Sequence, residues 1–430
     1  MLNCFELTGG KTAGMPERKK INKNLMLLLA GRTVSDMGTS IQAAVIPLYI
    51  IDTGGSAAAI GLYSFLSLMP ALIVYPFAGV LGDRHNRKTI MVSSDFVCGA
   101  VILFLALSAY SGFLTIKLLL AAQIVVSTMN GLFDPATKAI LPGLVEGEKL
   151  SRANSSIASL RTLSGLAGPV IGTLLYAVFG IKALFLVNGI SFVLSGISET
   201  FITYVHLNRQ CETKFFPDLL GGFKFVFSQK MIWNLCFFLL AIYALIMPLF
   251  SVALPLFFRT SLNYPDTQYG LLQAVFAAGA LAGSISAGVL FGKGNKEIKA
   301  IDTGLFLIMA STVCFVIMLF PQSFDLLGKG TMLYFCIFAC VIGLLSVSVM
   351  LINVPVQTLI QKEAPERFMS RVFAVVGMIT KGGLPFGALV YGLTLEKIET
   401  HWSVLISTCL LLFVSVSFRG FLKTKKSNCP

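Results

Sequence analysis

The chain has 430 residues, of which 56% are hydrophobic and only 12% charged, and its mean hydropathy is +0.83. Soluble domains carry roughly 25% charged residues, so this composition excludes an ordinary soluble protein and predicts an all-α membrane protein. The net charge of +13 does not indicate nucleic-acid binding, because the sequence offers no soluble module with the basic, groove-reading face that such binding needs.

Apolar runs about 20 residues long, the length of one helical crossing of a bilayer, recur along the whole chain. A polar, basic segment precedes the first run, and it lacks the apolar core and the small-residue cleavage site of a signal peptide. The runs predict twelve transmembrane helices, in chain order Asn24–Ile51, Ala58–Leu81, Thr89–Tyr110, Ile116–Phe133, Ile157–Phe179, Lys182–Val205, Met231–Phe258, Tyr269–Phe291, Ala300–Phe320, Thr331–Gln357, Arg371–Leu395 and His401–Phe421. Because this count is even, both termini lie on the same side of the membrane.

Lysine and arginine are retained on the cytoplasmic side of membranes, so their positions indicate orientation. With both termini in the cytoplasm, 25 of the 33 lysine and arginine residues fall on cytoplasmic segments or helix ends, five fall outside and three lie within helices. The sequence therefore predicts a multi-pass protein with both termini cytoplasmic.

The chain divides near its middle. The longest polar stretch between helices, residues 206–230, follows the sixth helix and is too short for a soluble catalytic domain. Shifting the sequence by 209 residues aligns Gly61–Leu81 with Gly270–Leu290 without a gap, and both segments end in AGVL. We expect two pseudo-symmetric six-helix bundles, with these boundaries: cytoplasmic N-terminal segment 1–23, first bundle 24–205, cytoplasmic linker 206–230, second bundle 231–421 and cytoplasmic tail 422–430.

The loop between the second and third predicted helices concentrates charge in an otherwise apolar region; its sequence is Gly79-Val-Leu-Gly-Asp83-Arg84-His-Asn86-Arg87-Lys88. This run is similar to G-x-x-x-D-R-x-G-R-K, the loop motif of the major facilitator superfamily, with Asn86 at the position of a glycine. Asparagine is among the few residues that tolerate a positive φ. After residue 23 the whole chain resembles this superfamily, and the resemblance implies the major facilitator fold, a working monomer and the cytoplasmic membrane of a bacterium.

The charges of this loop suit a latch on the cytoplasmic face. Gly79 allows close helix approach, and Asp83 can lie opposite the positive N-terminal end of a neighbouring helix. Cations of the loop can also pair with carboxylates on adjacent helices; the residues are Arg84, Arg87 and Lys88 on one side and Asp95 and Asp134 on the other. The alternative is a basic loop that only fixes the topology.

The fifth predicted helix carries small residues at regular spacing, among them Ser164, Gly168, Pro169 and Gly172. The run resembles the superfamily's antiporter motif, G-x-x-x-G-P-x-x-G-G, with serine and threonine at two of the glycine positions. Small residues and a proline permit tight packing and a bend, which suits a helix between the two bundles. The resemblance implies export coupled to inward proton flow, and ordinary small-residue packing is the alternative.

A third likeness lies at the junction of the fourth and fifth predicted helices. There Phe133-Asp134-Pro135-Ala136 begins a run of about two dozen residues that ends at Ser155. The run resembles the branch of the superfamily that contains macrolide efflux proteins and the enterobactin exporter. It implies a drug, a macrolide or a siderophore as the substrate.

Charged side chains inside the bilayer cost about 2.5 kcal/mol or more, so each needs a function or a partner. Arg32 and Asp36 lie one helical turn apart near the middle of the first predicted helix. Burial favours the neutral form of a carboxyl group, whereas a neighbouring arginine favours its charged form. The charge state of Asp36 can therefore depend on the side to which the cavity opens. Asp36, Arg32 and Glu199 of the sixth helix are the candidates for proton coupling. A permanent ion pair is the alternative for Arg32 and Asp36.

Two further cations lie within helices, Arg161 in the fifth and Lys381 in the eleventh, at nearly matching positions of the two halves. They can neutralise Asp36 or Glu199, or contact an anionic group of the substrate, and Arg161 can also snorkel to the interface. Polar uncharged residues are candidates for the same cavity or for hydrogen bonds between helices: Gln42, Gln123, Asn130, Asn188, Asn234, Gln273 and Asn353.

These features predict a secondary transporter that uses the proton gradient to export an amphipathic small molecule by rocking its two halves. Import of a small metabolite is the first alternative, and a non-transporting sensor or scaffold is the second. The sequence has no G-x-x-x-x-G-K-[ST] loop for ATP, its three histidines are scattered, and its nine cysteines show no CxxC pairing. We therefore expect no enzymatic activity, metal or cofactor. The expected partners are the lipid bilayer, protons and the substrate.

Overall fold

The computed structural model describes residues 16–84, 86–145, 147–204, 215–291, 297–328, 330–363 and 369–427. Within these ranges the chain is helical and contains no strand. Its elements are α1 (Pro16–Asp52), α2 (Ala57–Arg84), α3 (Arg87–Tyr110), α4 (Ile116–Leu144), α5 (Gly147–Thr200), α6 (Phe215–Ser228), α7 (Lys230–Leu245), the π-helical turn η1 (Leu249–Ala253), α8 (Leu254–Leu256), the π-helical turn η2 (Phe257–Leu262), α9 (Asp266–Phe291), α10 (Glu297–Leu319), α11 (Pro321–Leu327), α12 (Met332–Glu363), α13 (Met369–Leu395) and α14 (Thr400–Ser427).

Eleven helices of the described chain are long and apolar enough to cross a membrane. One of them, the part of α5 from Ser159 to Thr200, has 42 residues, about twice the length of one crossing. It is interrupted at Gly180, whose φ of 69° and ψ of −174° are not helical and favour glycine. Gly180 falls between the fifth and sixth predicted helices, so α5 contains two crossings. The described chain thus has the twelve transmembrane helices that the sequence predicts.

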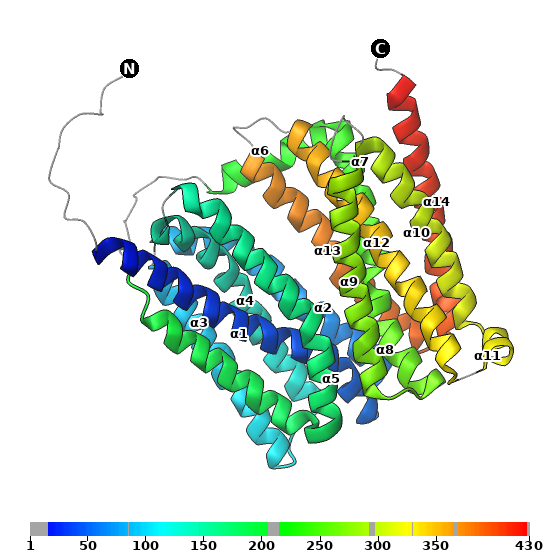
Figure 1. The fold of residues 1–430 in the computed structure, drawn as a ribbon, viewed down its shortest axis with the longest axis horizontal. Helices are drawn as coiled ribbons and strands as arrows, with labels where there is room; N and C mark the ends of the chain where they lie inside the picture. Colours follow the sequence, from blue (N-terminus) through cyan, green and yellow to red (C-terminus); the bar gives the residue numbers. More distant parts are fainter. Residues whose placement is uncertain are drawn as a thin grey trace.

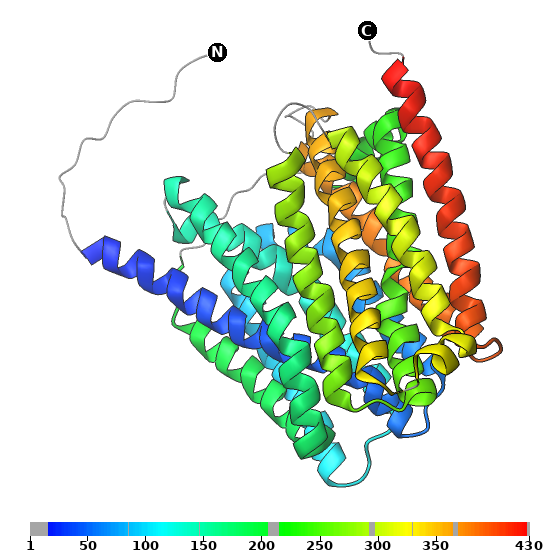
Figure 2. The same cartoon turned by 45° about the vertical axis from the view of Figure 1, so that its right-hand side comes forward.

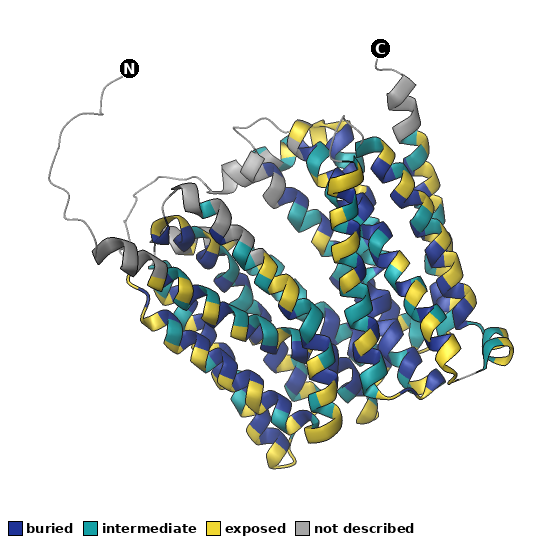
Figure 3. Cartoon of the chain, in the orientation of Figure 1, coloured by how far each residue is buried: buried dark blue, intermediate teal, exposed yellow. Residues whose placement is uncertain are grey.

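The outer faces of the helices are apolar. Exposed residues run along the outward-facing sides of the helices (Figure 3), and among them are the large apolar side chains of Val178, Val289 and Phe413. Water would penalise such a surface, whereas lipid tails do not. The predicted class, an all-α membrane protein, is confirmed.

The helices form two groups with related packing. In the first group α1 and α3 pack against α5, and α2 packs against α4. In the second group α9 and α10 pack against α12, and α7 packs against α13. Contacts between the groups are also paired, because α2 packs against α13 and α5 against α9. This arrangement confirms the two pseudo-symmetric six-helix bundles.

The two bundles are not parallel. Figure 1 and Figure 2 show that they meet at one end of the molecule and diverge toward the end at which α1 begins and α14 ends. We call the latter the terminal end and the other the opposite end.

The fourth helix is longer than the sequence predicts. α4 continues beyond Phe133 to Leu144, although Pro135 and Pro142 lie inside it. A proline removes one N–H donor from a helix, and the helix can absorb this loss as a bend. Asp134 therefore lies inside the helix instead of at its end. Lys138 lies inside it as well.

Three other helix extents differ from the prediction. α1 begins at Pro16, inside the segment that was expected to precede the first helix, and α14 continues to Ser427. α6 forms within the expected linker, residues 206–230. Residues 1–15, 205–214 and 428–430 lie outside the described residues, so the boundaries of the two bundles stay predictions.

The seventh crossing is interrupted. α7 ends at Leu245, and the turns η1 and η2 flank the short α8 before the crossing ends at Leu262. Pro248 and Pro255 lie in this stretch, and each lacks the N–H donor of a regular helix. Within this irregular segment, Arg259 of η2 forms a hydrogen bond with the last residue of α1, Asp52.

Candidate functional site

A cavity of about 390 Å³ lies between the first bundle and α13. Its walls combine charged side chains with aromatic and small apolar ones, as in sites for organic ligands. Seventeen lining residues come from α1–α5 and three from α13: Arg32, Ser35, Asp36, Thr39, Ser67, Leu68, Ala71, Leu72, Tyr75, Asp95, Asn130, Gly131, Phe133, Asp134, Lys138, Arg161 and Phe192, and then Gly377, Met378 and Lys381.

Arg32 of α1 connects two carboxylates in this cavity. Its Nη2 atom donates a hydrogen bond to Asp134 Oδ1 at 2.6 Å, and its Nε atom lies 3.3 Å from Asp36 Oδ2. On the other side of Asp134, Arg161 Nη1 lies 3.7 Å from Oδ2. Asp134 thus has two cationic partners, whereas Asp36 shares one at a longer distance. Asp36 is the less strongly held carboxylate.

Asp95 of α3 and Glu199 of α5 form a second acidic pair. Asp95 lines the cavity, while Glu199 is fully buried and does not line it. Among the residues that the structure describes, neither carboxyl oxygen of Glu199 nor Oδ2 of Asp95 has a hydrogen-bond partner. Within the described part of the chain no three histidine, cysteine, aspartate or glutamate residues are grouped so that they could hold a metal ion.

Three of the nine predicted cavity residues line the cavity, namely Asn130, Arg161 and Lys381. Lys381 is exposed and makes no ion pair with a residue that the structure describes. The sequence analysis missed Lys138, whose Nζ atom donates a hydrogen bond to Tyr75 Oη at 3.2 Å and lies 5.9 Å from the centre of its ring. Lys138 lies one helical turn after Asp134. If the fourth helix had been predicted to continue through Pro135, the two residues would have been placed on the same face.

The other six predicted cavity residues do not line this cavity: Gln42, Gln123, Asn188, Asn234, Gln273 and Asn353. Asn188 of α5 donates a hydrogen bond to Gln42 Oε1 of α1 at 2.5 Å, and both are buried. Asn353 of α12 donates one to Tyr243 Oη of α7 at 3.2 Å. These contacts are the interhelical hydrogen bonds that were the alternative explanation.

The charged loop between α2 and α3 is described in part. The side chains of Asp83 and Arg84, and the surroundings of Gly79, lie outside the described part of the chain. Arg87 Nη1 donates a hydrogen bond to the Ala139 carbonyl at 2.9 Å, and Lys88 Nζ donates one to the Thr200 carbonyl at 2.7 Å. The loop thus holds the ends of α4 and α5, and its role as a latch stays a prediction.

Asp134 pairs with Arg32 and Arg161, and its expected pairing with the loop stays a prediction, because the side chains of Asp83 and Arg84 lie outside the described part of the chain. One expectation for this loop needs correction. Asn86 does not adopt a positive φ, since its φ is −63° and its ψ is 116°. Instead it is the N-cap of α3, and its side-chain oxygen accepts a hydrogen bond from the Lys88 backbone N–H at 3.0 Å.

The small residues of the fifth helix allow two close approaches. On one face, a Cβ atom on Gly168 would lie 2.5 Å from Ser40 Cβ, and one on Gly172 would lie 3.0 Å from the Ile41 carbonyl oxygen, both in α1. Ser164 is buried on the same helix. On another face, the Pro169 carbonyl lies against Gly270 of α9 in the second bundle. The helix therefore lies at the interface between the bundles, while its role in antiport stays a prediction.

An ion-pair network joins the two bundles at the opposite end, and the sequence analysis did not identify it. Arg259 donates from Nε to Asp52 Oδ1 at 2.6 Å and from Nη2 to Asp52 Oδ2 at 2.7 Å. Its Nη1 atom donates to Asp266 Oδ1 at 2.8 Å. Tyr176 of α5 donates to Asp52 Oδ2 at 2.7 Å. No sequence pattern links Asp52 and Tyr176 to Arg259, because they are far apart in the chain.

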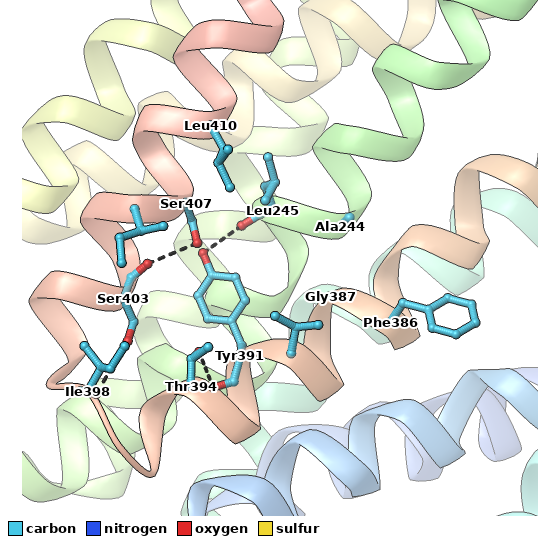
Figure 4. A pocket seen from close by; sticks show the side chains of 12 residues that line it. Ala244, Leu245, Phe386, Gly387, Tyr391, Thr394, Ile398, Ser403, Ser407 and Leu410 are labelled. Carbon is cyan, nitrogen blue, oxygen red and sulfur yellow. Dashed lines mark hydrogen bonds between the residues drawn. The ribbon is translucent and has the colours of Figure 1, made fainter.

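A second pocket of about 300 Å³ lies between α7, α13 and α14 (Figure 4). Tyr391 stands at its centre and donates a hydrogen bond to the Leu245 carbonyl at 3.1 Å. None of its lining residues is charged, and Phe386 and Leu410 are exposed on the outer surface. The charged cavity between the bundles is therefore the candidate functional site.

Comparison with known proteins agrees with this geometry. Residues 28–388 match the sequence profile of the Major Facilitator Superfamily. The chain is 25% identical to macrolide efflux protein A of Streptococcus pyogenes over 391 residues, which is 90% of this chain and 93% of that protein. It is 24% identical to a multi-drug resistance efflux pump PmrA homolog of Lactococcus lactis over 437 residues, covering 96% of this chain and 99% of that protein. Among solved structures, a bacterial homologue of the iron transporter ferroportin in its inward-facing state is similar with a TM-score of 0.71 and 16% identity, covering 93% of this chain and 99% of that one.

Proposed function

The chain belongs to the Major Facilitator Superfamily, and on this premise we propose that it exports an amphipathic small molecule in exchange for protons. As a member of that superfamily it is a multi-pass membrane transporter and not an enzyme. The proton gradient would supply the energy, and the two bundles would rock about the cavity between them.

The position of Asp36 is the observation that carries this proposal. Asp36 lies in the cavity with its side chain 23% exposed, and its only ion-pair partner in the described chain is Arg32, at 3.3 Å. Arg32 is held more closely by Asp134, at 2.6 Å. A proton can therefore neutralise Asp36 while Arg32 keeps a carboxylate partner. Protonation then changes the charge of the cavity without leaving a buried guanidinium unpaired.

The shape of the molecule supports the proposal that the cavity opens toward the terminal end. The cavity residues Tyr75, Lys138 and Arg161 lie in the parts of their helices nearest that end, where the bundles diverge (Figure 1). The opposite end is closed by the contacts of Arg259. The distribution of lysine and arginine favours a cytoplasmic terminal end, so this conformation faces inward in the cytoplasmic membrane of a bacterium.

Two observations favour export over import. Several relatives are named for macrolide and multidrug efflux, and the fifth helix, which carries the antiporter-like spacing, lies at the interface between the bundles. The cavity offers the amphipathic substrate aromatic surface from Phe133 and Phe192 beside its charges. Such a wall fits bulky organic molecules better than small metabolites.

Everted membrane vesicles test the proposal. Vesicles with an acidic lumen are given a panel of amphipathic dyes and macrolides, and both lumenal pH and compound uptake are followed. We expect uptake of at least one compound together with alkalinisation of the lumen, and we expect Asp36→Asn to abolish the alkalinisation. Vesicles that release the compound in an acid-dependent manner would reverse the direction, and uptake without any pH change would remove proton coupling.

A further inference from the structure

The cavity contains more cationic than anionic side chains. Three carboxylates and four cations line it; they are Asp36, Asp95 and Asp134, and Arg32, Lys138, Arg161 and Lys381. Arg32 and Arg161 pair with the carboxylates. Neither lysine has a carboxylate within ion-pair distance among the described residues. Within the described chain the two ammonium groups thus have no ion-pair partner, and Asp134 attracts both only from a greater distance.

These two lysines line the same cavity from different bundles. Among the described residues, Lys381 of α13 is the only charged lining residue that the second bundle supplies. Arg161 of α5 and Lys138 of α4, both in the first bundle, repel Lys381, and this repulsion exceeds the attraction of Asp134. Repulsion between like charges is stronger inside a protein than in bulk water, because the effective dielectric constant is lower there. In the empty cavity it opposes approach of the two bundles at the terminal end.

We propose that the transported molecule carries an anionic group, such as a carboxylate, sulfonate or phosphate, which binds between Lys381 on one bundle and Lys138 and Arg161 on the other. This inference rests on the proposed transport function and names the charge of its substrate. Ammonium and guanidinium groups form short, charge-assisted hydrogen bonds to such oxyanions. One bound anion replaces the repulsion across the cavity by attraction to both sides.

The apolar walls fit the remainder of such a molecule. Phe133, Phe192 and Met378 line the same cavity, and its volume of about 390 Å³ lies within the usual range of pockets for small organic ligands. Tyr75 already holds Lys138 by a hydrogen bond, which orients the ammonium group before the ligand arrives. The expected ligand is an organic anion with an aromatic or aliphatic body.

This cavity is less suited to a cationic substrate. Asp36 and Asp134 are engaged by Arg32, and Asp134 also by Arg161. Asp95 is buried, with its side chain turned toward Ser195 of α5. A cation would therefore have to displace an arginine from a carboxylate, and it would meet the unpaired lysines as well.

The same arrangement of lysines links binding of the anion to closure of the cavity at the terminal end. An anion that touches both Lys381 and Lys138 draws α13 toward α4, so the loaded cavity closes at the terminal end while the empty one stays open. Release at the opposite end then restores the repulsion. Binding energy from the substrate would thus favour the conformational change itself.

Binding to the purified full-length protein in lipid nanodiscs tests the proposal without requiring transport. Two dyes with the same xanthene body are compared by fluorescence anisotropy, the anionic carboxyfluorescein and the cationic rhodamine 6G. We expect carboxyfluorescein to bind at least tenfold more tightly. Lys381→Met and Lys138→Met should each weaken its binding about tenfold or more, and Lys381→Arg should retain most of it.

Lys117→Met is the matched control, because Lys117 is an exposed lysine at the other end of α4; its dye affinities should match the wild type. Tighter binding of rhodamine 6G, no binding of carboxyfluorescein, or equal effects of Lys117→Met and Lys381→Met would overturn the proposal. Selective binding of the anion without exchange in vesicles would instead leave this inference standing and contradict the proposed function.

Discussion

Gly61 of α2 lies against Gly392 of α13 so closely that a Cβ atom on Gly61 would stand 2.9 Å from the Gly392 Cα atom. The 209-residue repeat aligns Gly61 with Gly270 of α9, where a Cβ atom would lie 3.0 Å from the Pro169 carbonyl oxygen of α5. Two related glycines thus occupy the two related interfaces between the bundles. At each position the absence of a side chain lets the backbones approach.

Alanine at Gly61 should favour opening of the opposite end. The added methyl group would lie 2.5 Å from the Ala388 carbonyl oxygen, and such overlap costs about 1 to 3 kcal/mol. Separation of α2 from α13 relieves it. The measurement is the labelling rate of a cysteine at Phe65, which contacts Phe386 across the interface, with a membrane-impermeant maleimide. We expect the rate to rise roughly tenfold in Gly61→Ala.

Gly288→Ala is the control for this experiment. Gly288 is also a helical glycine, in α9, but a Cβ atom there would meet nothing within 4 Å. The labelling rate in Gly288→Ala should equal that of the unsubstituted protein. An equal rise in both variants, or none in Gly61→Ala, would show that this glycine contact does not hold the opposite end closed.

Loss of Arg259 should also favour opening of the opposite end. The guanidinium donates to both oxygens of Asp52 and to Asp266, and Asp52 belongs to the other bundle. A partly exposed network of this kind is worth about 1 kcal/mol, so Arg259→Gln should change the ratio of conformers roughly fivefold. Distances between spin labels on the two bundles measure this ratio.

Arg419→Gln provides the comparison for Arg259. Arg419 of α14 makes a similar bidentate pair with Asp302 of α10, but both residues lie within one bundle. Its loss should leave the conformer ratio unchanged. If Arg419→Gln shifts the ratio as much as Arg259→Gln does, the network at the opposite end is not a gate.

Asp36 and Asp134 should respond differently to the same substitution. Asp36→Asn should abolish proton movement and leave thermal stability nearly unchanged, because Arg32 keeps Asp134. Asp134→Asn should lower the free energy of unfolding by about 2 kcal/mol, because Arg32, which is 6% exposed, loses its closest partner. Proton flux in vesicles and thermal unfolding of the purified variants measure the two effects. If Asp134→Asn abolished proton coupling while Asp36→Asn kept it, Asp134 would be the proton carrier and Asp36 would not.

Glu199 should tolerate glutamine but not alanine. Its carboxyl group is fully buried without a hydrogen-bond partner in the described chain, a site that suits an uncharged side chain. Glu199→Gln should keep both the melting temperature and proton coupling, whereas Glu199→Ala should leave a void and cost about 1 to 2 kcal/mol. Thermal unfolding and lumenal pH measurements check both. Loss of coupling in Glu199→Gln would make Glu199, which does not line the cavity, a proton carrier.

The fold could be predicted from the sequence because the length of an apolar run is a strong indicator of a transmembrane helix. Each crossing needs about 20 apolar residues, and the gap between the fifth and sixth predicted helices coincides with the break at Gly180. The repeat identified Gly61 and Gly270, and both lie where the bundles meet. The prediction missed the continuation of α4, because Pro135 and Pro142 suggested an end where the helix bends.

The site could be predicted only in part. Arg32 and Asp36 are one turn apart, so their pairing follows from helical geometry. The approach of Arg32 to Asp134, and of Arg259 to Asp52, depends on tertiary packing between residues distant in the chain, and a single sequence contains no signal for it. For the same reason polar residues such as Gln42 and Asn188 could not be assigned to the cavity or to an interhelical hydrogen bond before the fold was known.

The most direct test of alternating access is a pair of distances measured by electron resonance in the same protein, after its nine native cysteines have been replaced with retention of transport. One label pair, at Met26 and Gln229, reports the terminal end, and the other, at Thr53 and Lys397, reports the opposite end. When a transported compound is added, we predict that the first distance shortens while the second lengthens. Transport with both distances unchanged, or with both changing in the same direction, would contradict the account.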